Sequence, residues 1–414
     1  MKILALNCGS SSVKYQLYDW KRQKPLAKGA VERIGLVNTF IIHSVHHHNH
    51  RLAIDCPDHT SAIMLIMKFL QDEEFGVIND LSDIGAVGHR IVHGGERFDK
   101  SVLIDNEVIE EIENLSDLAP LHNPPNLAGI NATKKLIPNV PQVAIFDTAF
   151  YQTMPEYAYM YAIPRKWYDR YHVRRYGFHG TSHLYVSRRA SVMLGKPWNE
   201  CNIISLHIGN GVSITAIENG IAVDTSMGFT PLEGAIMGTR SGDIDPAIPL
   251  FMQQAAGLNA DEVSVILNRR SGVLGITGKY TDRRDVIRLA NDGDRYCKLA
   301  LEMEHYHLKK YIGMYYAVLG HVDALVFTAG VGENSPHARE MSVAGLEHIG
   351  ISMDKEKNKN ILSSSGETDL TAEGGEVKIF MIPTNEELVF IEDVVGILSG
   401  EYTDPLTYKY TFSN

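Results

Sequence analysis

One pattern occurs twice in this chain and constrains its fold more than any other feature: a β-strand, a glycine-containing turn and a second β-strand. Near the N-terminus, the apolar run Ile3 to Leu6 leads into a Gly/Ser turn at Cys8 to Ser12. Apolar residues then alternate with polar ones at Val13, Tyr15 and Leu17, which is the period of a half-buried strand. The first twenty or so residues are therefore predicted to form a hairpin.

The same pattern returns in the second half of the chain. Ile203 to Ile208 are mostly apolar, Gly209 to Gly211 form a turn, and apolar residues alternate again from Val212 to Ala216. A third apolar strand, Ala324 to Phe327, runs into another glycine-containing segment. Two similar halves predict a duplicated α/β fold with a cleft between the halves.

The chain length agrees with a duplication, because 414 residues are too many for one ordinary domain. The expected domains are residues 1–149 plus 385–414, and residues 150–384. Apolar residues at helical spacing predict helices at Glu107 to Leu118 and Arg295 to Leu319. Ala119 to Asn126 contains three prolines and is predicted to be a loop.

Composition limits the classes of partner. The net charge of −11 argues against a nucleic-acid partner, although clustered arginines can still bind a small anion. Four cysteines lie far apart without a CxxC pair, which indicates reduced thiols rather than disulfides or a zinc site. No apolar run is long enough for a signal peptide or a membrane span, so a cytoplasmic location is expected.

Two turns could bind phosphate. The segment from Leu6 to Lys14, LNCGSSSVK, brings backbone N–H groups, hydroxyls and a lysine into one turn. His207 to Ser213, HIGNGVS, is a similar turn with a histidine. Gly and Ser also favour an ordinary hairpin turn, so either segment alone is compatible with both readings. Neither matches a P-loop or a dinucleotide-binding motif, so a nucleotide would bind in a different kind of turn.

Two arginines have surroundings suited to an anion site. Arg90 follows an apolar strand in GHRIVHGG, and Arg240 lies among glycines in MGTRSGDIDP. A guanidinium group matches the planar geometry of a carboxylate or phosphate, although each arginine alone is more typical of the surface.

Histidines and carboxylates complete the set of candidate residues. His122 lies in the proline-rich loop, Asp147 follows an apolar run, and Glu386 lies in PTNEEL. His179 and His183 have the spacing of a zinc site, but the HExxH glutamate is missing, which disfavours zinc. The histidine run from His46 to His50 is interpreted as a solvated loop beside a strand.

Taken together, these segments resemble the acetate kinase family. The resemblance covers nearly the whole chain, in order: LNCGSSSVK, GHRIVHGG, LAPLHNPPN, IFDTAFYQTMP, RRYGFHGTSH, SLHIGNGVS, DTSMGFTPLEGAIMGTRSGDIDP, SGVLGITGKYTDRRD, FTAGVGENS and PTNEEL. It implies an α/β fold of duplicated ribonuclease H-like domains, and reversible, magnesium-dependent phosphoryl transfer between ATP and acetate. The implied partners are ATP/ADP, acetate/acetyl phosphate and a second copy of the chain in a homodimer, and Mn²⁺ could replace Mg²⁺.

The resemblance also implies a role for each matching residue. The expected catalytic residues are Arg90, Arg240, His179, His122, Asp147 and Asn7. The acetate pocket would be formed by Arg90, Val92, Leu121, Phe178 and Pro231. The expected nucleotide-binding residues are Ser10, Ser12, Lys14, His207, Gly209, Asn210, Gly211, Asp282, Arg283, Arg284, Gly330, Val331, Gly332, Glu333 and Asn334. The expected magnesium ligands, direct or through water, are Asn7, Asp147 and Glu386.

The resemblance implies direct in-line transfer, and the residue set suits this route. Acetate is already ionised at neutral pH, so the reaction needs positioning and positive charge rather than a strong base. The alternatives are a phosphorylated Asp147 intermediate, a relative that acts on propionate or butyrate or uses pyrophosphate, and a non-catalytic ATP switch of the actin or chaperone type.

Overall fold

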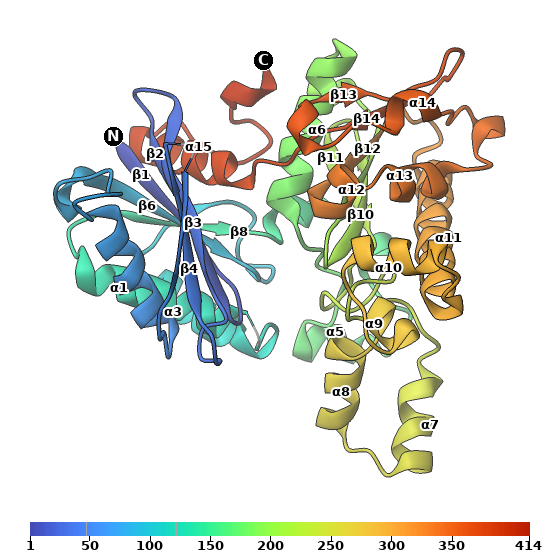
Figure 1. Cartoon of the computed structure of the whole chain (residues 1–414), viewed down its shortest axis with the longest axis horizontal. Coiled ribbons are helices and arrows are strands. Elements are labelled where there is room, and N and C mark those ends of the chain that lie inside the picture. Colours follow the sequence, from blue (N-terminus) through green and yellow to red (C-terminus); the bar gives the residue numbers. More distant parts are fainter. Residues whose placement is uncertain (47, 121) are drawn as a thin grey trace. The chain divides into compact units, whose positions relative to one another are not determined.

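The computed structural model describes residues 1–46, 48–120 and 122–414, and the chain divides into two compact units. The first unit contains Met1–Phe150 and Asn385–Thr411, and the second contains Tyr151–Thr384 and Phe412–Asn414. Each unit is built around its own β-sheet (Figure 1).

The first unit has a sheet of eight strands in the order β5-β4-β3-β2-β1-β6-β8-β7. Its strands are β1 Lys2–Cys8, β2 Ser12–Asp19, β3 Lys24–Glu32, β4 Phe40–Val45, β5 His48–Ala53, β6 Ile84–Ile91, β7 Val102–Leu103 and β8 Gln142–Phe146. Its α-helices are α1 His59–Leu70, α2 Asn106–Asn114, α3 Asn123–Leu136 and α15 Glu386–Ser399.

Helices cover both faces of this sheet. Leu4 and Leu6 of β1 share a buried core with residues of α1 and α3. Side chains alternate between the two faces of a strand. On the face opposite that core, a Cβ atom at Gly88 of β6 would lie 3.1 Å from Val394 Cγ2 and 3.5 Å from Phe390 Cβ, both in α15. The absence of a side chain at Gly88 therefore lets α15 pack closely on the first sheet. Helix α15 belongs to the second chain segment of this unit, Asn385–Thr411.

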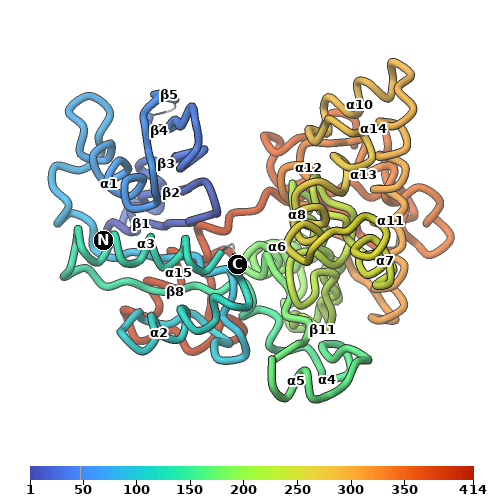
Figure 2. The backbone as a smooth tube through the Cα atoms, turned by 90° about the horizontal axis from the view of Figure 1, so that it is seen from below, coloured from blue at the N-terminus to red at the C-terminus, as the bar shows by residue number. Residues whose placement is uncertain are grey.

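The second unit has a sheet of six strands in the order β11-β10-β9-β12-β14-β13. Its strands are β9 Ile203–Ile208, β10 Val212–Glu218, β11 Ile221–Thr225, β12 Ala324–Thr328, β13 Thr368–Asp369 and β14 Lys378–Met381. Its α-helices are α4 Glu156–Tyr159, α5 Lys166–Tyr171, α6 Gly180–Leu194, α7 Ala247–Ala256, α8 Ala260–Arg269, α9 Gly272–Thr277, α10 Arg283–Asn291, α11 Arg295–Leu319, α12 Ala329–Asn334, α13 Pro336–Val343 and α14 Lys355–Asn358. Helices α10 and α13 both pack against α11 (Figure 2).

Short 3₁₀ helices lie in the connections of both units. They are Leu81–Asp83, Leu115–Asp117, Ala149–Tyr151, Trp198–Glu200, Glu347–Ile349, Ser363–Ser365 and Thr411–Ser413.

The two sheets repeat one arrangement, which confirms the predicted duplication. In the first, β1 pairs antiparallel with β2, β2 antiparallel with β3, β1 parallel with β6, and β6 parallel with β8. In the second, β9, β10, β11, β12 and β14 pair in the same way. The predicted hairpins correspond to β1–β2 and β9–β10, and the helix predicted at Arg295 to Leu319 is α11.

Two sequence-based assignments are wrong. Asn123 to Asn126, predicted as loop, form the first turn of α3, with proline at the start of the helix. Proline is tolerated there because the first helical N–H groups have no intrahelical partner. In the histidine run, His48 and His50 belong to strand β5 rather than to a loop, because they pair with Val45 and His43 of β4. His47, within the same run, and Leu121 lie outside the described residues.

Candidate functional site

The carboxyl ends of β1, β6 and β8 bring the polar residues of the first unit together. These strands are parallel neighbours, and Asn7 of β1 lies opposite Arg90 of β6. Asp147 directly follows β8 and is fully buried. Because parallel strands end at the same edge of a sheet, residues far apart in the sequence meet there.

Arg90 is the centre of this group. Its Nε donates a hydrogen bond to Asp147 Oδ1 at 2.9 Å, its Nη2 donates to Asp147 Oδ2, and its Nη1 donates to Asn7 Oδ1 at 3.2 Å. Burial opposes the charged form of Arg90, but the negative charges of Asp147 and Glu386 raise its pKa above the usual value. Arg90 is therefore a permanent cation held in one orientation by a two-pronged ion pair.

Glu386 begins helix α15, directly after Asn385, whose Oδ1 accepts a hydrogen bond from Leu388 N at 3.2 Å. Its charge contributes to the raised pKa of Arg90, which places its carboxylate in the same electrostatic environment. The candidate site of the first unit thus combines one arginine with two carboxylates and the amide of Asn7.

The β1–β2 turn is closed by backbone and side-chain hydrogen bonds. Gly9 N donates to Ser12 O at 2.8 Å, and the His59 ring contacts Gly9 O through Nε2 at 2.6 Å. The Ser10 and Lys14 residues of this turn are exposed to solvent. Their polar groups are therefore accessible to a ligand.

Two asparagines that sequence reasoning did not single out hold this edge of the sheet in place. Asn126 Nδ2 donates to Cys8 O at 2.7 Å, and its Oδ1 accepts from Val92 N at 3.1 Å. Asn123 Oδ1 accepts from His93 N at 3.2 Å. Both side chains are buried. The signal in the sequence was the pair of asparagines on either side of Pro124 and Pro125, on residues that the structure places inside the protein.

The expected acetate pocket is divided among several segments. Val92 and Phe178 are buried, in the first and second units respectively, and the Phe178 carbonyl accepts a hydrogen bond from Tyr151 Oη at 2.6 Å. Leu121 is outside the described residues. His122 directly precedes α3 and is partly buried.

In the second unit, four buried or partly buried polar side chains form a chain next to the β9–β10 turn. The rings of His179 and His207 stack with centroids 4.0 Å apart and an interplanar angle of 12°. Nδ1 of His179 contacts Ser213 Oγ at 2.9 Å, and Nε2 of His183 contacts the same oxygen at 2.7 Å. Burial lowers the pKa of His183 well below its usual value, and the nearby His207 lowers it further. His183 is therefore neutral, and its other ring nitrogen, Nδ1, contacts Ser205 Oγ at 2.9 Å. Both ring nitrogens of His183 thus contact serine hydroxyls, which disfavours the zinc pair considered from its spacing.

Arg240 lies beside this histidine chain. A Cβ atom at Gly211 would lie 3.3 Å from His179 Cε1 and 3.4 Å from Arg240 Nη1, so both side chains face the same turn. Arg240 Nη1 donates to Pro231 O at 3.2 Å and contacts Met237 Sδ at 3.6 Å. Among residues 1–46, 48–120 and 122–414, no carboxylate forms an ion pair with Arg240, and burial lowers its pKa. Arg240 is thus a largely buried cation whose hydrogen-bond partners, Pro231 O and Met237 Sδ, are neutral.

The expected nucleotide residues fall into two groups. Arg283 is buried, and its Nη2 donates to Glu304 Oε1 at 2.5 Å, whereas Arg284 is exposed and paired with Asp282. A Cβ atom at Gly238 would collide with Asn210 Oδ1 and lie 3.2 Å from Arg283 Nη1. Asn210 and Arg283 are therefore close neighbours, while Asp282 and Arg284 lie at the start of α10.

The second group is the turn from β12 into α12. Ala329 has a positive φ of 64°, an uncommon conformation for a residue with a side chain. Its N–H donates to Glu333 Oε1 at 2.8 Å, and the same oxygen accepts from Thr384 N at 3.0 Å. No atom lies within 4 Å of a Cβ built at Gly330, so the space beside this turn is open. Burial raises the pKa of Glu333, which holds the turn rather than facing solvent.

The chemistry of the first unit suits a hard divalent cation. Asn7, Asp147 and Glu386 offer amide and carboxylate oxygens, the ligands that magnesium prefers. Within the part of the chain that the structure describes, no cluster of three or more His, Cys, Asp or Glu side chains could hold a metal alone.

Comparison with known proteins gives the family of the chain. The sequence profile of the acetokinase family matches residues 2–392. The chain belongs to the acetokinase family. It is 59% identical over 414 residues to an acetate kinase of Geobacter metallireducens, a match that covers all of this chain and 98% of the relative.

Two solved structures agree with the fold. An acetate kinase of Porphyromonas gingivalis matches with a TM-score of 0.90 at 46% identity, covering 96% of this chain and 99% of its own. A propionate kinase of Francisella tularensis matches with a TM-score of 0.88 at 40% identity, covering 95% and 98%. Membership in the acetokinase family confirms the α/β fold class and makes this chain a kinase. No helix among the described residues is both long and apolar enough to cross a membrane.

Proposed function

We propose that this chain is an acetate kinase that transfers the γ-phosphoryl group of ATP to acetate, giving acetyl phosphate and ADP, and that it also runs in reverse. The observation that carries the proposal is Arg240: a largely buried guanidinium group beside His179 without a carboxylate partner among the described residues. A buried charge is costly unless it is paired, so such a group fits a site that receives an anion.

The other site residues divide the work of binding and transfer. Arg90, fixed by Asp147 and Asn7, would orient the acetate carboxylate. Arg240, His179 and His122 would donate hydrogen bonds to the phosphoryl oxygens as charge develops on them. An acetate oxygen attacks the γ-phosphorus in line, the new P–O bond forms as the bond to ADP breaks, and the electron pair leaves with ADP. No base is needed because acetate is already ionised, and catalysis rests on positioning and electrostatics.

A divalent cation, which we propose is magnesium, would be held by Asp147 and Glu386, directly or through water, with Asn7 nearby. It would supply positive charge that offsets the phosphate oxygens. Both oxygens of Asp147 already accept hydrogen bonds from Arg90, and each retains capacity for a further contact. Manganese has similar ligand preferences and could substitute.

The nucleotide would lie on the second unit. Its phosphates would contact the β9–β10 turn from His207 to Gly211. Further contacts to phosphate would come from Ser10, Ser12 and Lys14 of the β1–β2 turn. The adenosine would occupy the open space beside Gly330, Val331 and Gly332. On one side of it would lie Glu333 and Asn334 of α12. On the other would lie the start of α10, with Asp282, Arg283 and Arg284. The open space at Gly330 supports this placement.

A homodimer in the cytoplasm belongs to the same proposal. Helix α11 exposes an apolar stripe of six residues, which we name the α11 stripe: Tyr296, Leu299, Met303, Tyr306, Met314 and Val318. Spacings of three, four and eight residues place these side chains on one face of the helix. Exposed apolar stripes of this kind mark association surfaces.

One assay tests the function. The protein is mixed with ATP, magnesium, hydroxylamine and either acetate or propionate, and acyl hydroxamate is measured. We expect product with acetate, less with propionate, and none when the divalent metal is chelated. Propionate is the second candidate because a propionate kinase is a close structural neighbour.

Each contrary outcome of the assay has a distinct meaning. Faster turnover with propionate would make the chain a propionate kinase. Faster turnover with pyrophosphate than with ATP at matched concentration would overturn the nucleotide assignment, and turnover that survives complete metal removal would overturn the metal assignment. No acyl product from any donor or acid would refute the proposed activity itself.

A further inference from the structure

Arg240 lies in a long connection without regular secondary structure. This connection, which we name the arginine loop, comprises residues 226–246 between β11 and α7. Much of it is buried, although it has no helix or strand to hold its shape. Loops of this length need side-chain contacts if one conformation is to persist.

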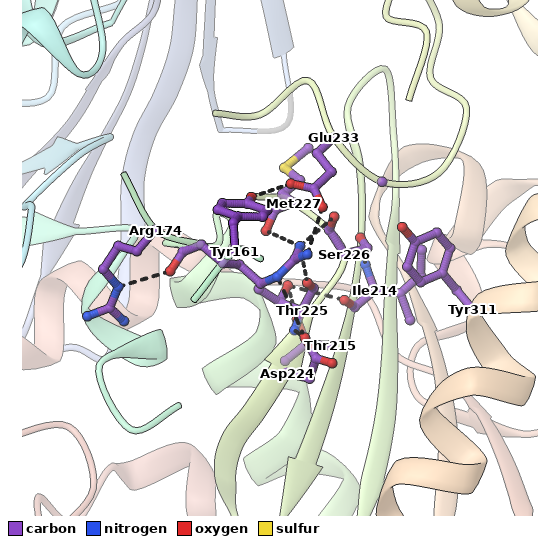
Figure 3. A network of polar contacts seen from close by, with 12 residues as sticks. Tyr161, Arg174, Ile214, Thr215, Asp224, Thr225, Ser226, Met227, Glu233 and Tyr311 are labelled. Carbon is purple, nitrogen blue, oxygen red and sulfur yellow. Dashed lines mark hydrogen bonds and ion pairs between the residues drawn. The ribbon is translucent and has the colours of Figure 1, made fainter. Parts of the chain in front are cut away.

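The first set of contacts joins the arginine loop to Arg175. Nη1 of Arg175 donates to Thr225 O at 3.0 Å and Ser226 O at 3.3 Å, and Nη2 donates to Glu233 Oε1 at 2.7 Å. Tyr161 Oη donates to the other oxygen of Glu233 and accepts from Phe229 N at 2.9 Å. Figure 3 shows Glu233, Tyr161 and the backbone of residues 225–227 converging on this cluster. We name it the Glu233 clamp.

The second set joins the loop to helix α11. Asp243 Oδ1 accepts from Gly234 N at 2.8 Å, and Asp243 N donates to Gly234 O at 2.8 Å. Tyr311 of α11 donates to Asp243 Oδ2 at 2.5 Å. Gly234 has a φ of 115°, and a Cβ there would lie 2.8 Å from Ser226 O, so only glycine fits. We name this set the Asp243 clamp.

Arg240 lies between the two clamps in the sequence and depends on both. Its guanidinium is held by Pro231 O, two residues before Glu233, and its backbone lies three residues before Asp243. The arginine itself has no carboxylate partner among the described residues that could fix its orientation. The orientation of the Arg240 side chain therefore depends on the backbone conformation of the loop, and the two clamps stabilise that conformation.

The chemistry of the Glu233 clamp is consistent with positioning rather than stability. Arg175 and Glu233 are mostly buried, and removing two charges from water offsets much of their attraction. A hydrogen-bonded charged cluster favours one arrangement of its partners, because another arrangement would leave buried polar groups without their hydrogen bonds. Here those partners are the end of β11 at Thr225 and the loop backbone at Ser226 and Phe229.

We propose that Glu233 and Asp243 are positioning residues: with Arg175, Tyr161 and Tyr311, they hold the arginine loop so that Arg240 faces His179 and Gly211. This inference rests on the proposed role of Arg240 in phosphoryl transfer. Neither carboxylate contacts the reacting atoms, and both act through Arg240.

The decisive experiment is a double-mutant cycle between Glu233 and Arg240. In Glu233→Gln the side chain keeps its shape, but one of its two acceptor oxygens becomes a donor that opposes Arg175 or Tyr161. We expect kcat to fall by about tenfold with little change in KM for ATP, because misplacing one oriented donor reduces transition-state stabilisation. In an Arg240→Ala background the same change should have less than about a twofold effect, since coupled residues are not additive.

Glu367→Gln is the matched control. Glu367 forms a comparable two-pronged ion pair with Arg189 in the same unit, away from the arginine loop, with bonds of 2.5 and 2.8 Å. It should leave kcat unchanged in both backgrounds. Equal losses for Glu233→Gln in the two backgrounds, or no loss in either, would overturn the proposal.

A second measurement separates this proposal from the proposed function. Amide hydrogen exchange at residues 227–242 should be faster in Glu233→Gln and in Tyr311→Phe than in the native protein or Glu367→Gln. This readout needs no activity. Unchanged exchange in both clamp variants would refute the clamps, whereas faster exchange in a protein without acetate kinase activity would leave them standing and refute the function alone.

Discussion

At the scale of single residues, the two arginines have opposite electrostatic surroundings. Arg90 is held by the buried carboxylate of Asp147, whereas Arg240 has only neutral hydrogen-bond partners among the residues that the structure describes. Because of this ion pair, the Arg90 guanidinium is suited to keep one orientation throughout the proposed reaction. Arg240 has charge available for an anion that comes and goes.

The geometry at Arg90 predicts that lysine cannot replace it. Arg90→Lys keeps the charge but loses the fork that contacts Asp147 through Nε and Nη2 and Asn7 through Nη1. We expect kcat/KM for acetate to fall, with a loss of roughly 3–4 kcal/mol in transition-state stabilisation, as when one preorganised donor is lost. Steady-state kinetics measure it, with Arg97→Lys, a surface arginine, as the control. Near-normal turnover in Arg90→Lys would mean that Arg90 is peripheral.

A second prediction concerns the length of the acid. Val92 is buried two residues after Arg90, and its N–H is held by Asn126 Oδ1. If Val92 lines the acyl pocket, Val92→Ala should raise kcat/KM for propionate relative to acetate. One methylene is worth about 1–3 kcal/mol in such a pocket, so the ratio should change severalfold. A ratio equal to that of the native protein would remove Val92 from the pocket.

At the scale of elements, the β9–β10 turn is the point where His179 and Arg240 meet. A methyl group at Gly211 would lie 3.3 Å from His179 Cε1 and 3.4 Å from Arg240 Nη1, closer than most carbon contacts. Gly211→Ala should therefore push both side chains aside and lower kcat/KM by about tenfold or more, as expected when oriented groups shift. The thermal midpoint should change little, because the contacts are with side-chain ends. Gly313→Ala, where nothing lies within 4 Å, is the control and should have normal activity.

Helix α15 contains a buried carboxylate that should make the first unit sensitive to pH. Asp393 accepts hydrogen bonds from Ser101 Oγ at 2.6 Å and Tyr410 Oη at 2.8 Å. These bonds favour the charged form, but complete burial outweighs them and raises the pKa of Asp393 from 3.8 to about 7. The folded protein therefore keeps a proton at Asp393 over a pH range in which the unfolded chain has released it.

The direction of the pH effect follows from this difference. Between pH 4 and 7 the folded state binds more protons than the unfolded state, so stability falls as pH rises and becomes level above pH 7. In Asp393→Asn this contribution is absent. Between pH 5 and pH 8, the native protein should lose about 2–3 kcal/mol relative to the variant. Denaturant unfolding of both proteins at the two pH values measures this, and parallel pH profiles would show that Asp393 does not titrate in this range.

At the scale of the whole molecule, one strand arrangement occurs twice, and each copy has candidate site residues at the carboxyl ends of its parallel strands. In the first unit these are Asn7, Arg90 and Asp147, and in the second the turns that follow β9 and β12. Duplication explains why two similar turns, LNCGSSSVK and HIGNGVS, occur in one chain.

Association of two chains through the α11 stripe is the prediction at this scale. Tyr306 is 62% exposed near the middle of the stripe. Tyr306→Glu would place a charge in an apolar contact, and we expect it to convert a dimer into a monomer, because a buried unpaired charge costs several kcal/mol. Light scattering after size-exclusion chromatography measures the mass. Lys298→Glu, on the same helix but outside the stripe, should remain dimeric; a Tyr306→Glu protein that stays dimeric would place the interface elsewhere.

The sequence by itself determined the elements that depend on local pattern. The β1–β2 and β9–β10 hairpins, helix α11 and the duplication followed from periodicity and turn residues, because each is set by residues close together in the chain. The order of motifs also led to the acetokinase family. The first turn of α3 and the histidines of β5 were assigned wrongly. Burial of Asn123 and Asn126 overrides the local preference for a loop in α3, and pairing with β4 overrides it in β5.

Only the tertiary structure decided how the site residues are held. The Arg90–Asp147 ion pair, the Asn126 bonds to Cys8 and Val92, and the clamps on the arginine loop all join residues from separate elements. No local pattern encodes such pairs, because the partners meet only after the sheets have formed and their strand ends are aligned. Whether an arginine becomes a fixed cation, like Arg90, or one available to an anion, like Arg240, depends on which carboxylates burial brings beside it, and burial is a property of the folded chain.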